Sequence, residues 1–137
     1  AFSVQAGWTQ TSRNRATIAT FGANPSYLHL MQSDFNDAGE RAWLIGGAVD
    51  FTPGGLSGLT LKVGYGSGRG AVDSSTGASL GSQNETDVQL AFATDRSSSL
   101  HGLSLGLEGS WLNQAGATAQ GRQLRAFVNY EIPLPRL

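Results

Sequence analysis

Residues that could act on a small solute are few in this chain, and they lie at alternate positions of extended segments. The 137 residues include nine Lys and Arg, ten Asp and Glu and two His, for a formal charge of −1. Side chains of both signs spaced in this way can attract and sort small ions and polar solutes. The residues that we expect to line one polar surface are Lys62, Asp87, Gln89, Glu108, Arg125, Asn129 and Glu131.

A second group of charges, Asp34, Asp37, Glu40 and Arg41, lies close together in one polar stretch. The three carboxylates could bind a cation or pair with the Arg41 guanidinium. The alternative is a set of solvated side chains that brace a loop, because exposed ion pairs contribute little to stability. Both interpretations stay open at this point.

The sequence contains no convincing motif for catalysis, metal binding or cofactor binding. His29 and His101 fall in different connections without a further ligand at metal-binding spacing, and the chain has no Cys. No G-x-S-x-G elbow accompanies the Ser, His and Asp residues. Residues 66–71 (GSGRGA) have the form of a dinucleotide fingerprint, but the residues after them cannot open the helix that it needs. We therefore expect no enzyme, metal or cofactor.

The composition excludes several protein classes. Charged residues make up 14% of the chain, against roughly 25% in an ordinary soluble domain. The charge is nearly balanced, which excludes a basic nucleic-acid-binding module. No apolar run approaches the ~18 residues that a transmembrane helix needs. The 19 glycines are about twice the average share, which favours turns and close packing over helices.

Apolar and polar residues alternate along most of the sequence, which is typical of strands with one apolar face. One face of the segment at 59–66 carries Leu59, Leu61, Val63 and Tyr65, and the other carries Thr60, Lys62 and two glycines. The pattern predicts an all-β, antiparallel, up-and-down fold. The six strands that we expect are 2–9, 41–51, 59–66, 86–94, 103–111 and 123–132.

The connections alternate between long and short, so the short turns fall at one end of the sheet. Residues 10–40, 69–85 and 114–121 form the expected long loops, whereas 52–58 and 96–102 form short turns. Outer-membrane barrels have short periplasmic turns and long extracellular loops.

The two faces of the predicted strands favour lipid on one side and water on the other. The polar faces carry Gly, Ser, Ala, Thr and Gln with few charges, which suits a water-filled lumen. Trp8, Trp43, Phe51, Tyr65, Trp111 and Tyr130 lie near strand ends, as in the aromatic girdles of membrane barrels. Two alternatives remain, a soluble β-barrel or sandwich that binds a small ligand and a small structural membrane barrel with a plugged interior and no conductance.

Four segments then resemble OprD-family porins of Gram-negative bacteria. Residues 27–43 (YLHLMQSDFNDAGERAW) are similar to a loop and strand start of the type SDFN…GE-x-x-W in that family. Three further segments are similar to strands of the family in the same order: 54–63 (GGLSGLTLKV), 100–107 (LHGLSLGL) and 123–134 (QLRAFVNYEIPL). The resemblance covers essentially the whole chain.

This resemblance implies a transmembrane pore of eighteen antiparallel strands in the bacterial outer membrane. Inward-folded loops would narrow the channel, and amino acids, carboxylates or similar small nutrients would diffuse through it passively. Loop 10–40 would be a constriction, with Asp34, Asp37, Glu40 and the adjacent Arg41 as the candidate residues. The implied partners are the lipid bilayer, lipopolysaccharide, small polar solutes and the remaining strands, with no nucleic acid and with an oligomer left open.

On this interpretation residues 1–137 are the C-terminal portion of one barrel domain. Six strands cannot close a membrane barrel, since the smallest single-chain barrels have eight. Either Ala1 is a cut or several chains share one wall, and we favour the first.

One departure from the family concerns charge. Several members carry a ladder of inward arginines, but the matching positions here are Gly106 and Glu108. We therefore expect a mixed-charge lumen with weak ion selectivity, and specificity for carboxylates is in doubt.

Overall fold

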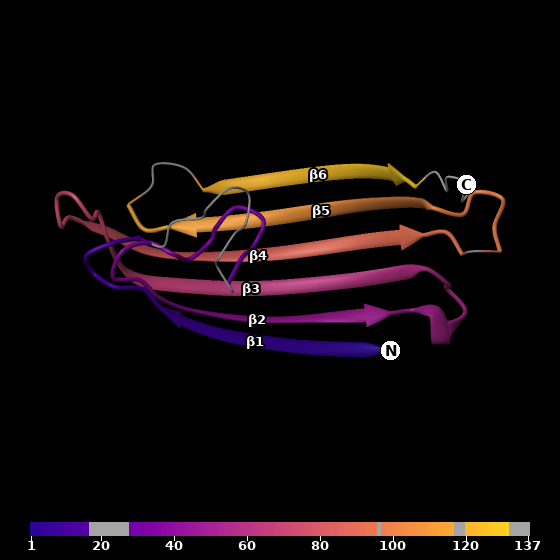
Figure 1. The fold of residues 1–137 in the computed structure, drawn as a ribbon, viewed down its shortest axis with the longest axis horizontal. Helices are drawn as coiled ribbons and strands as arrows, with labels where there is room; N and C mark the ends of the chain where they lie inside the picture. The colour runs from indigo at the N-terminus through magenta and orange to yellow at the C-terminus, as the bar shows by residue number, and fades with distance from the viewer. Residues whose placement is uncertain (17–27, 96, 117–119, 132–137) are drawn as a thin grey trace, which may run out of the picture.

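The computed structural model describes residues 1–16, 28–95, 97–116 and 120–131. Within these residues the chain forms one antiparallel sheet in which each strand pairs with its sequence neighbours (Figure 1). The strands are β1 (Phe2–Gln10), β2 (Arg41–Asp50), β3 (Leu59–Val72), β4 (Ser79–Ala93), β5 (Leu103–Gln114) and β6 (Gly121–Tyr130). The predicted all-β, up-and-down arrangement is confirmed.

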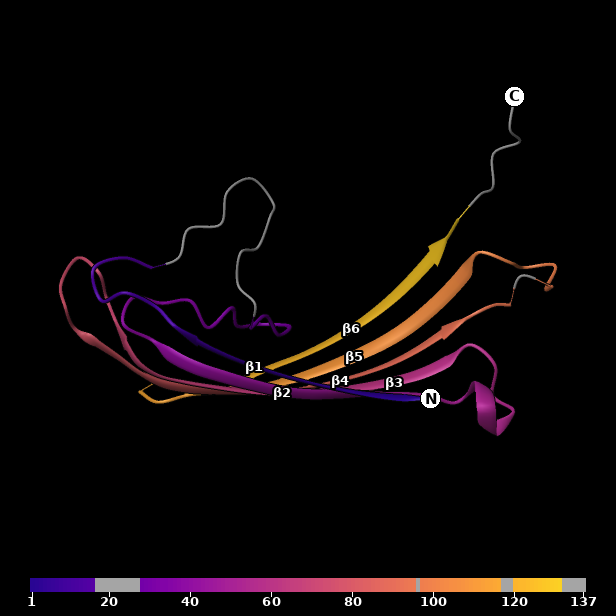
Figure 2. The ribbon, with the colours of Figure 1, turned by 60° about the horizontal axis from the view of Figure 1, so that its bottom comes forward.

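The sheet is curved, and the segment between β1 and β2 lies against its concave face (Figure 2). We call residues 28–40 the docked segment. One helical turn, η1 (Thr52–Gly54), lies in the short turn after β2. Within the part of the chain that the structure describes, no helix is long and apolar enough to span a membrane.

The convex face of the sheet is apolar and uncovered. Register pairs place Trp8 opposite Trp43 and Leu90 opposite Leu107 on this face. Phe2 is 82% exposed and Leu124 is 77% exposed, although both are large apolar residues. A soluble domain does not leave such a surface in water, whereas a sheet that faces lipid presents an apolar outer band.

The expected long loop at 69–85 is wrong in its extent, because β3 continues to Val72 and β4 begins at Ser79. Only residues 73–78 connect the two strands, so this connection is shorter than 51–58 and 94–102 at the other end of the sheet. The expected contrast in loop length between the two ends therefore depends on the connection 11–40 alone. Gly66, Gly68 and Gly70 made this region read as a loop, but strand pairing uses backbone groups that glycine supplies as well as any residue. A register shift between Gly68 and Ala71, with Gly70 at φ 80°, bends β3 near its end.

The other boundaries lie close to their expected positions. The connections 11–40 and 115–120 separate β1 from β2 and β5 from β6. The last strand ends at Tyr130 instead of the expected position 132, which is outside the described residues.

Candidate functional site: a polar belt under a docked segment

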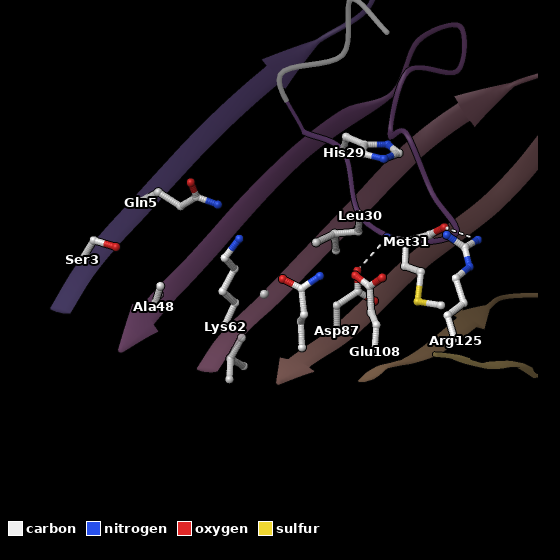
Figure 3. Close-up of a pocket in the computed structure, with 14 residues that line it drawn as sticks. Ser3, Gln5, His29, Leu30, Met31, Ala48, Lys62, Asp87, Glu108 and Arg125 are labelled. Carbon is white, nitrogen blue, oxygen red and sulfur yellow. Dashed lines mark hydrogen bonds between the residues drawn. The ribbon is translucent and has the colours of Figure 1, made fainter. Parts of the chain in front are cut away.

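Polar side chains form a belt across the concave face at one level of the sheet. In register, Lys62 lies opposite Gln89, Gln89 opposite Glu108, and Glu108 opposite Arg125. Asp87 is two residues from Gln89 on the same strand and therefore the same face. Figure 3 shows Asp87 and Glu108 between Lys62 and Arg125. The belt thus alternates in charge along its length.

The belt lines a pocket of about 440 Å³, on which the docked segment forms the facing side through His29, Leu30 and Met31. Five of the seven side chains expected to line a polar surface meet here: Lys62, Asp87, Gln89, Glu108 and Arg125. The other two lie toward the short-turn end of the sheet, where Asn129 pairs with Ser104 and Glu131 follows the end of β6. The pocket is therefore formed by one level of the sheet.

The docked segment is held by a small apolar core. Leu28, Leu30 and Phe35 of the segment pack with Ala42 and Leu44 of β2 in one buried cluster. Phe35 is 2% exposed. This cluster is the hydrophobic core of the described residues, and it lies between the segment and the concave face instead of between two sheets.

Glycines on the concave face make room for these side chains. A Cβ added to Gly66 would approach Phe35 to 2.8 Å and Leu30 to 3.0 Å, and one added to Gly7 would approach Leu28 to 2.6 Å. From the sequence, small residues on this face indicated space for water. At these positions the structure corrects that interpretation, because the space is filled by the docked segment.

Two buried carboxylates bind the backbone of the docked segment. The Met31 N–H donates to Asp87 Oδ2 at 2.6 Å, and the Gln32 N–H donates to Glu85 Oε1 at 2.7 Å. The Ser110 hydroxyl donates to the same Glu85 oxygen at 2.7 Å. Glu85 is fully buried and Asp87 is 8% exposed. Hydrogen bonds to ionised acceptors are about twice as strong as neutral ones, so this pair is a principal anchor of the segment.

Glu85 was not among the predicted site residues, and no packing role was predicted for the glycines of β3. The signal was present, since Glu85 lies two residues from Asp87, and glycines recur at every second position from Gly64 to Gly68. Period-two spacing on a strand places each of these sets on one face.

The four candidate constriction residues, Asp34, Asp37, Glu40 and Arg41, do not lie together on one surface. Glu40 is 1% exposed, and its carboxylate accepts from the Asp37 N–H at 3.1 Å and from Gln83 Nε2 at 2.9 Å. His29 Nδ1 lies 2.6 Å from Asp34 Oδ1. These contacts favour the loop-bracing interpretation over cation binding, and no group of three or more His, Cys, Asp or Glu in the described residues could hold a metal.

Arg41 lies on the opposite side of the sheet. It shares its face of β2 with Trp43 and Ile45, which belong to the convex apolar face. The expectation that Arg41 narrows a channel is therefore corrected, because strand alternation points its side chain away from the concave face.

The sequence profile described as "outer membrane porin, OprD family" matches residues 1–134. The chain belongs to this family. A comparison with curated protein sequences finds no significant match. The OprD-family membership confirms the resemblance in the four segments, although residues 27 and 132–134 of those segments lie outside the described part of the structure.

Solved structures of two Pseudomonas aeruginosa proteins have the same fold over part of their length. OccK9 (OpdG) is 28% identical with a TM-score of 0.84, and the match covers 97% of this chain and 34% of OccK9. OccK10 (OpdN) is 24% identical with a TM-score of 0.82, and the match covers 97% of this chain and 38% of OccK10. The chain therefore spans about a third of the length of these two structures.

The docked segment of this OprD-family chain is expected to bind less tightly as the pH rises. Burial raises the pKa of Glu40 above its ordinary value of 4.5, and the nearby Asp37 charge adds to this, while hydrogen bonds from Gln83 and Asp37 oppose it. Because the pKa of Glu40 is higher when the segment is docked than when it is released, the docked state binds more protons between these two pKa values. Docking therefore weakens as the pH rises through that range. Proteolysis of residues 28–40 between pH 4 and pH 7 measures this.

Glu40→Gln is the matched variant for this measurement, because glutamine keeps the shape of the side chain and one of its two acceptor oxygens and does not titrate. The difference in cleavage between wild type and Glu40→Gln is expected to grow with pH. Parallel pH profiles for the two proteins would contradict the prediction.

Proposed function

We propose that this chain forms part of the wall of an outer-membrane channel through which small water-soluble solutes diffuse without energy coupling. The observation that carries the proposal is the contrast between the two faces of one sheet. The convex face presents exposed apolar side chains such as Ile45 and Leu107, whereas the concave face presents the polar belt and the docked segment. A membrane on one side and an aqueous pathway on the other account for both.

We extend the proposal to the whole domain: residues 1–137 are a portion of a single barrel. The share of about a third covered in OccK9 agrees with six of the eighteen strands that the family resemblance implies. The other strands of that barrel would then complete the wall, with lipid and lipopolysaccharide outside it. The role is that of a channel and not of an enzyme.

The solute class follows from the belt. Lys62 and Arg125 offer cationic groups and Glu108 an anionic group on the lining of one pocket, so amino acids and small carboxylates can be matched there by opposite charges. A similar structure, P. aeruginosa OpdK with vanillate, is 28% identical over 74% of this chain, with a TM-score of 0.65. Vanillate is a carboxylate, which supports extending this solute class to the chain.

Planar bilayer recordings test the proposal. The full-length protein, with the remaining strands of the barrel, is purified in mild detergent. It is expected to conduct in discrete steps and to migrate differently on SDS gels with and without heating. Protein that stays in solution without detergent would support the soluble ligand-binding alternative. Folded protein that inserts but never conducts would support the structural barrel.

The charge selectivity of this wall is expected to depend on Lys62 and Arg125. Two unit charges ~8 Å apart in water interact by about 0.5 kcal/mol, which salt reduces to about 0.2 kcal/mol. Each of the two side chains attracts a permeating anion and repels a permeating cation by this amount. Replacing both with alanine is therefore expected to shift the ratio of anion to cation permeability toward cations by roughly fourfold. Reversal potentials under a salt gradient measure this shift.

Glu108→Gln is the matched control for the selectivity measurement, because it removes an opposite charge from the same belt. Its reversal potential is expected to move toward anions. Strong anion selectivity that survives Lys62→Ala and Arg125→Ala would place the filter in other strands.

A further inference from the structure

Three arginines meet at the end of the sheet that carries the long connection 11–40. Arg41 and Arg69 are direct register partners on the convex face of β2 and β3. Arg13 joins them from the residues after β1, where it lies against Gly39. All three line one pocket of about 390 Å³, and all three are exposed.

These arginines have no anionic partner among the described residues. The only ion pair there joins His29 and Asp34, and the lining of this pocket contains no Asp or Glu. No convex-face position of the six strands carries a carboxylate, since Asp50, Glu85, Asp87 and Glu108 all lie on the concave face. Three neighbouring cations without a counter-charge repel one another, so an external anion would relieve that repulsion.

The arginines lie at the level where the apolar surface ends. Arg41 is two residues from Trp43, which faces Trp8 across the strand pair on the convex face. Amphipathic tryptophan rings mark a membrane interface. Leu59, at the short-turn end of β3, is ten residues from Arg69, or about 33 Å along the strand. A tilt of 35–45° reduces this to the ~25 Å height of the apolar band of a barrel.

We propose that Arg13, Arg41 and Arg69 bind the phosphate groups of lipid A, the membrane anchor of lipopolysaccharide. The inference rests on the proposed function, because the long connection 11–40 places this end of the barrel on the extracellular side, where lipopolysaccharide forms the leaflet. Guanidinium groups bind phosphate oxygens in pairs with short, charge-assisted bonds. The phosphates of such a lipid would pair with the arginines, and its acyl chains would cover the apolar convex face below them.

Native mass spectrometry of the detergent-purified protein tests this site, with bisphosphorylated lipid A as the probe. We expect wild type to retain one lipid A at this site and Arg41→Gln with Arg69→Gln to weaken its binding at least tenfold. Dephosphorylated lipid A is expected to bind the wild type no more tightly than it binds the double variant. Arg122→Gln is the matched control, because Arg122 lies on the convex face opposite Trp111, three strands from Arg69, and its loss is expected to change binding less than twofold.

Equal binding of lipid A to wild type and the double variant would overturn the proposal. Displacement of the lipid by an equal concentration of inorganic phosphate would also overturn it, because it would indicate a site for a soluble anion. Arg41→Lys with Arg69→Lys is expected to retain part of the binding, which separates loss of charge from misfolding. Conductance is measured on the same samples and is expected to be unchanged in the glutamine variant, so failure of the channel proposal and failure of this one are distinguishable.

Discussion

Replacing Phe35 with alanine is expected to release the docked segment and to increase the single-channel conductance. The phenyl ring is buried against Leu30 and the glycines of β3, and removing a buried aromatic side chain costs about 3–5 kcal/mol. Phe35 also has a φ of 48°, in the left-handed region, which costs about 1–2 kcal/mol for a residue with a side chain. Packing must therefore hold this backbone in place, and its loss favours the released state.

Single-channel recording and limited proteolysis of residues 28–40 measure this effect together. Phe92→Ala is the matched control, because Phe92 is 40% exposed on the convex face and lies on the side of the sheet away from the docked segment. We expect higher conductance and faster cleavage in Phe35→Ala and neither change in the control. Wild-type conductance and cleavage in folded Phe35→Ala would show that the segment does not narrow the pathway or is anchored elsewhere.

Removing the carboxylates of Glu85 and Asp87 together is expected to release the same segment. Alanine at both positions leaves the Met31 and Gln32 N–H groups without their acceptors. An unsatisfied buried donor costs about 1–3 kcal/mol, so the double variant loses about 2–6 kcal/mol of docking. Conductance and proteolysis are expected to change as in Phe35→Ala.

The pair Glu85→Gln with Asp87→Asn separates hydrogen bonding from charge. The amide oxygens can accept from the same two N–H groups, and the two buried negative charges disappear. We therefore expect the amide variant to keep the segment docked. Release in the amide variant to the same extent as in the alanine variant would show that negative charge, and not acceptor capacity, anchors the backbone.

The strands and their two faces could be predicted from the sequence because period-two alternation is a local property. Leu59, Leu61 and Val63 share a face in any register that buries one side of the sheet or places it against lipid. The belt residues Lys62 and Glu108 could be assigned to the concave face on the same basis. The order of these residues across the sheet depends on pairing between strands, which the alternation within one strand does not specify. This pairing places Gln89 between Lys62 and Glu108, and Arg125 next to Glu108.

The role of the first long connection depended on tertiary structure. Asp34, Asp37, Glu40 and Arg41 are neighbours in sequence, yet Glu40 is buried at the end of the docked segment and Arg41 lies on the convex face. The strand begins at Arg41, so the side chains change from loop geometry to alternation between faces at that residue. Composition has no information about that boundary.

The sequence therefore determined the all-β meander, the apolar and polar faces and the family, since these follow from local alternation and from recognisable segments. Only the tertiary structure showed that the glycines of β3 receive Leu30 and Phe35, that Glu85 and Asp87 bind the Met31 and Gln32 N–H groups, and that Arg41 meets Arg69. The physical reason is that each of these contacts joins separate segments, up to 56 residues apart for Met31 and Asp87. Such contacts are set by strand register and by the path of the docked segment across the sheet.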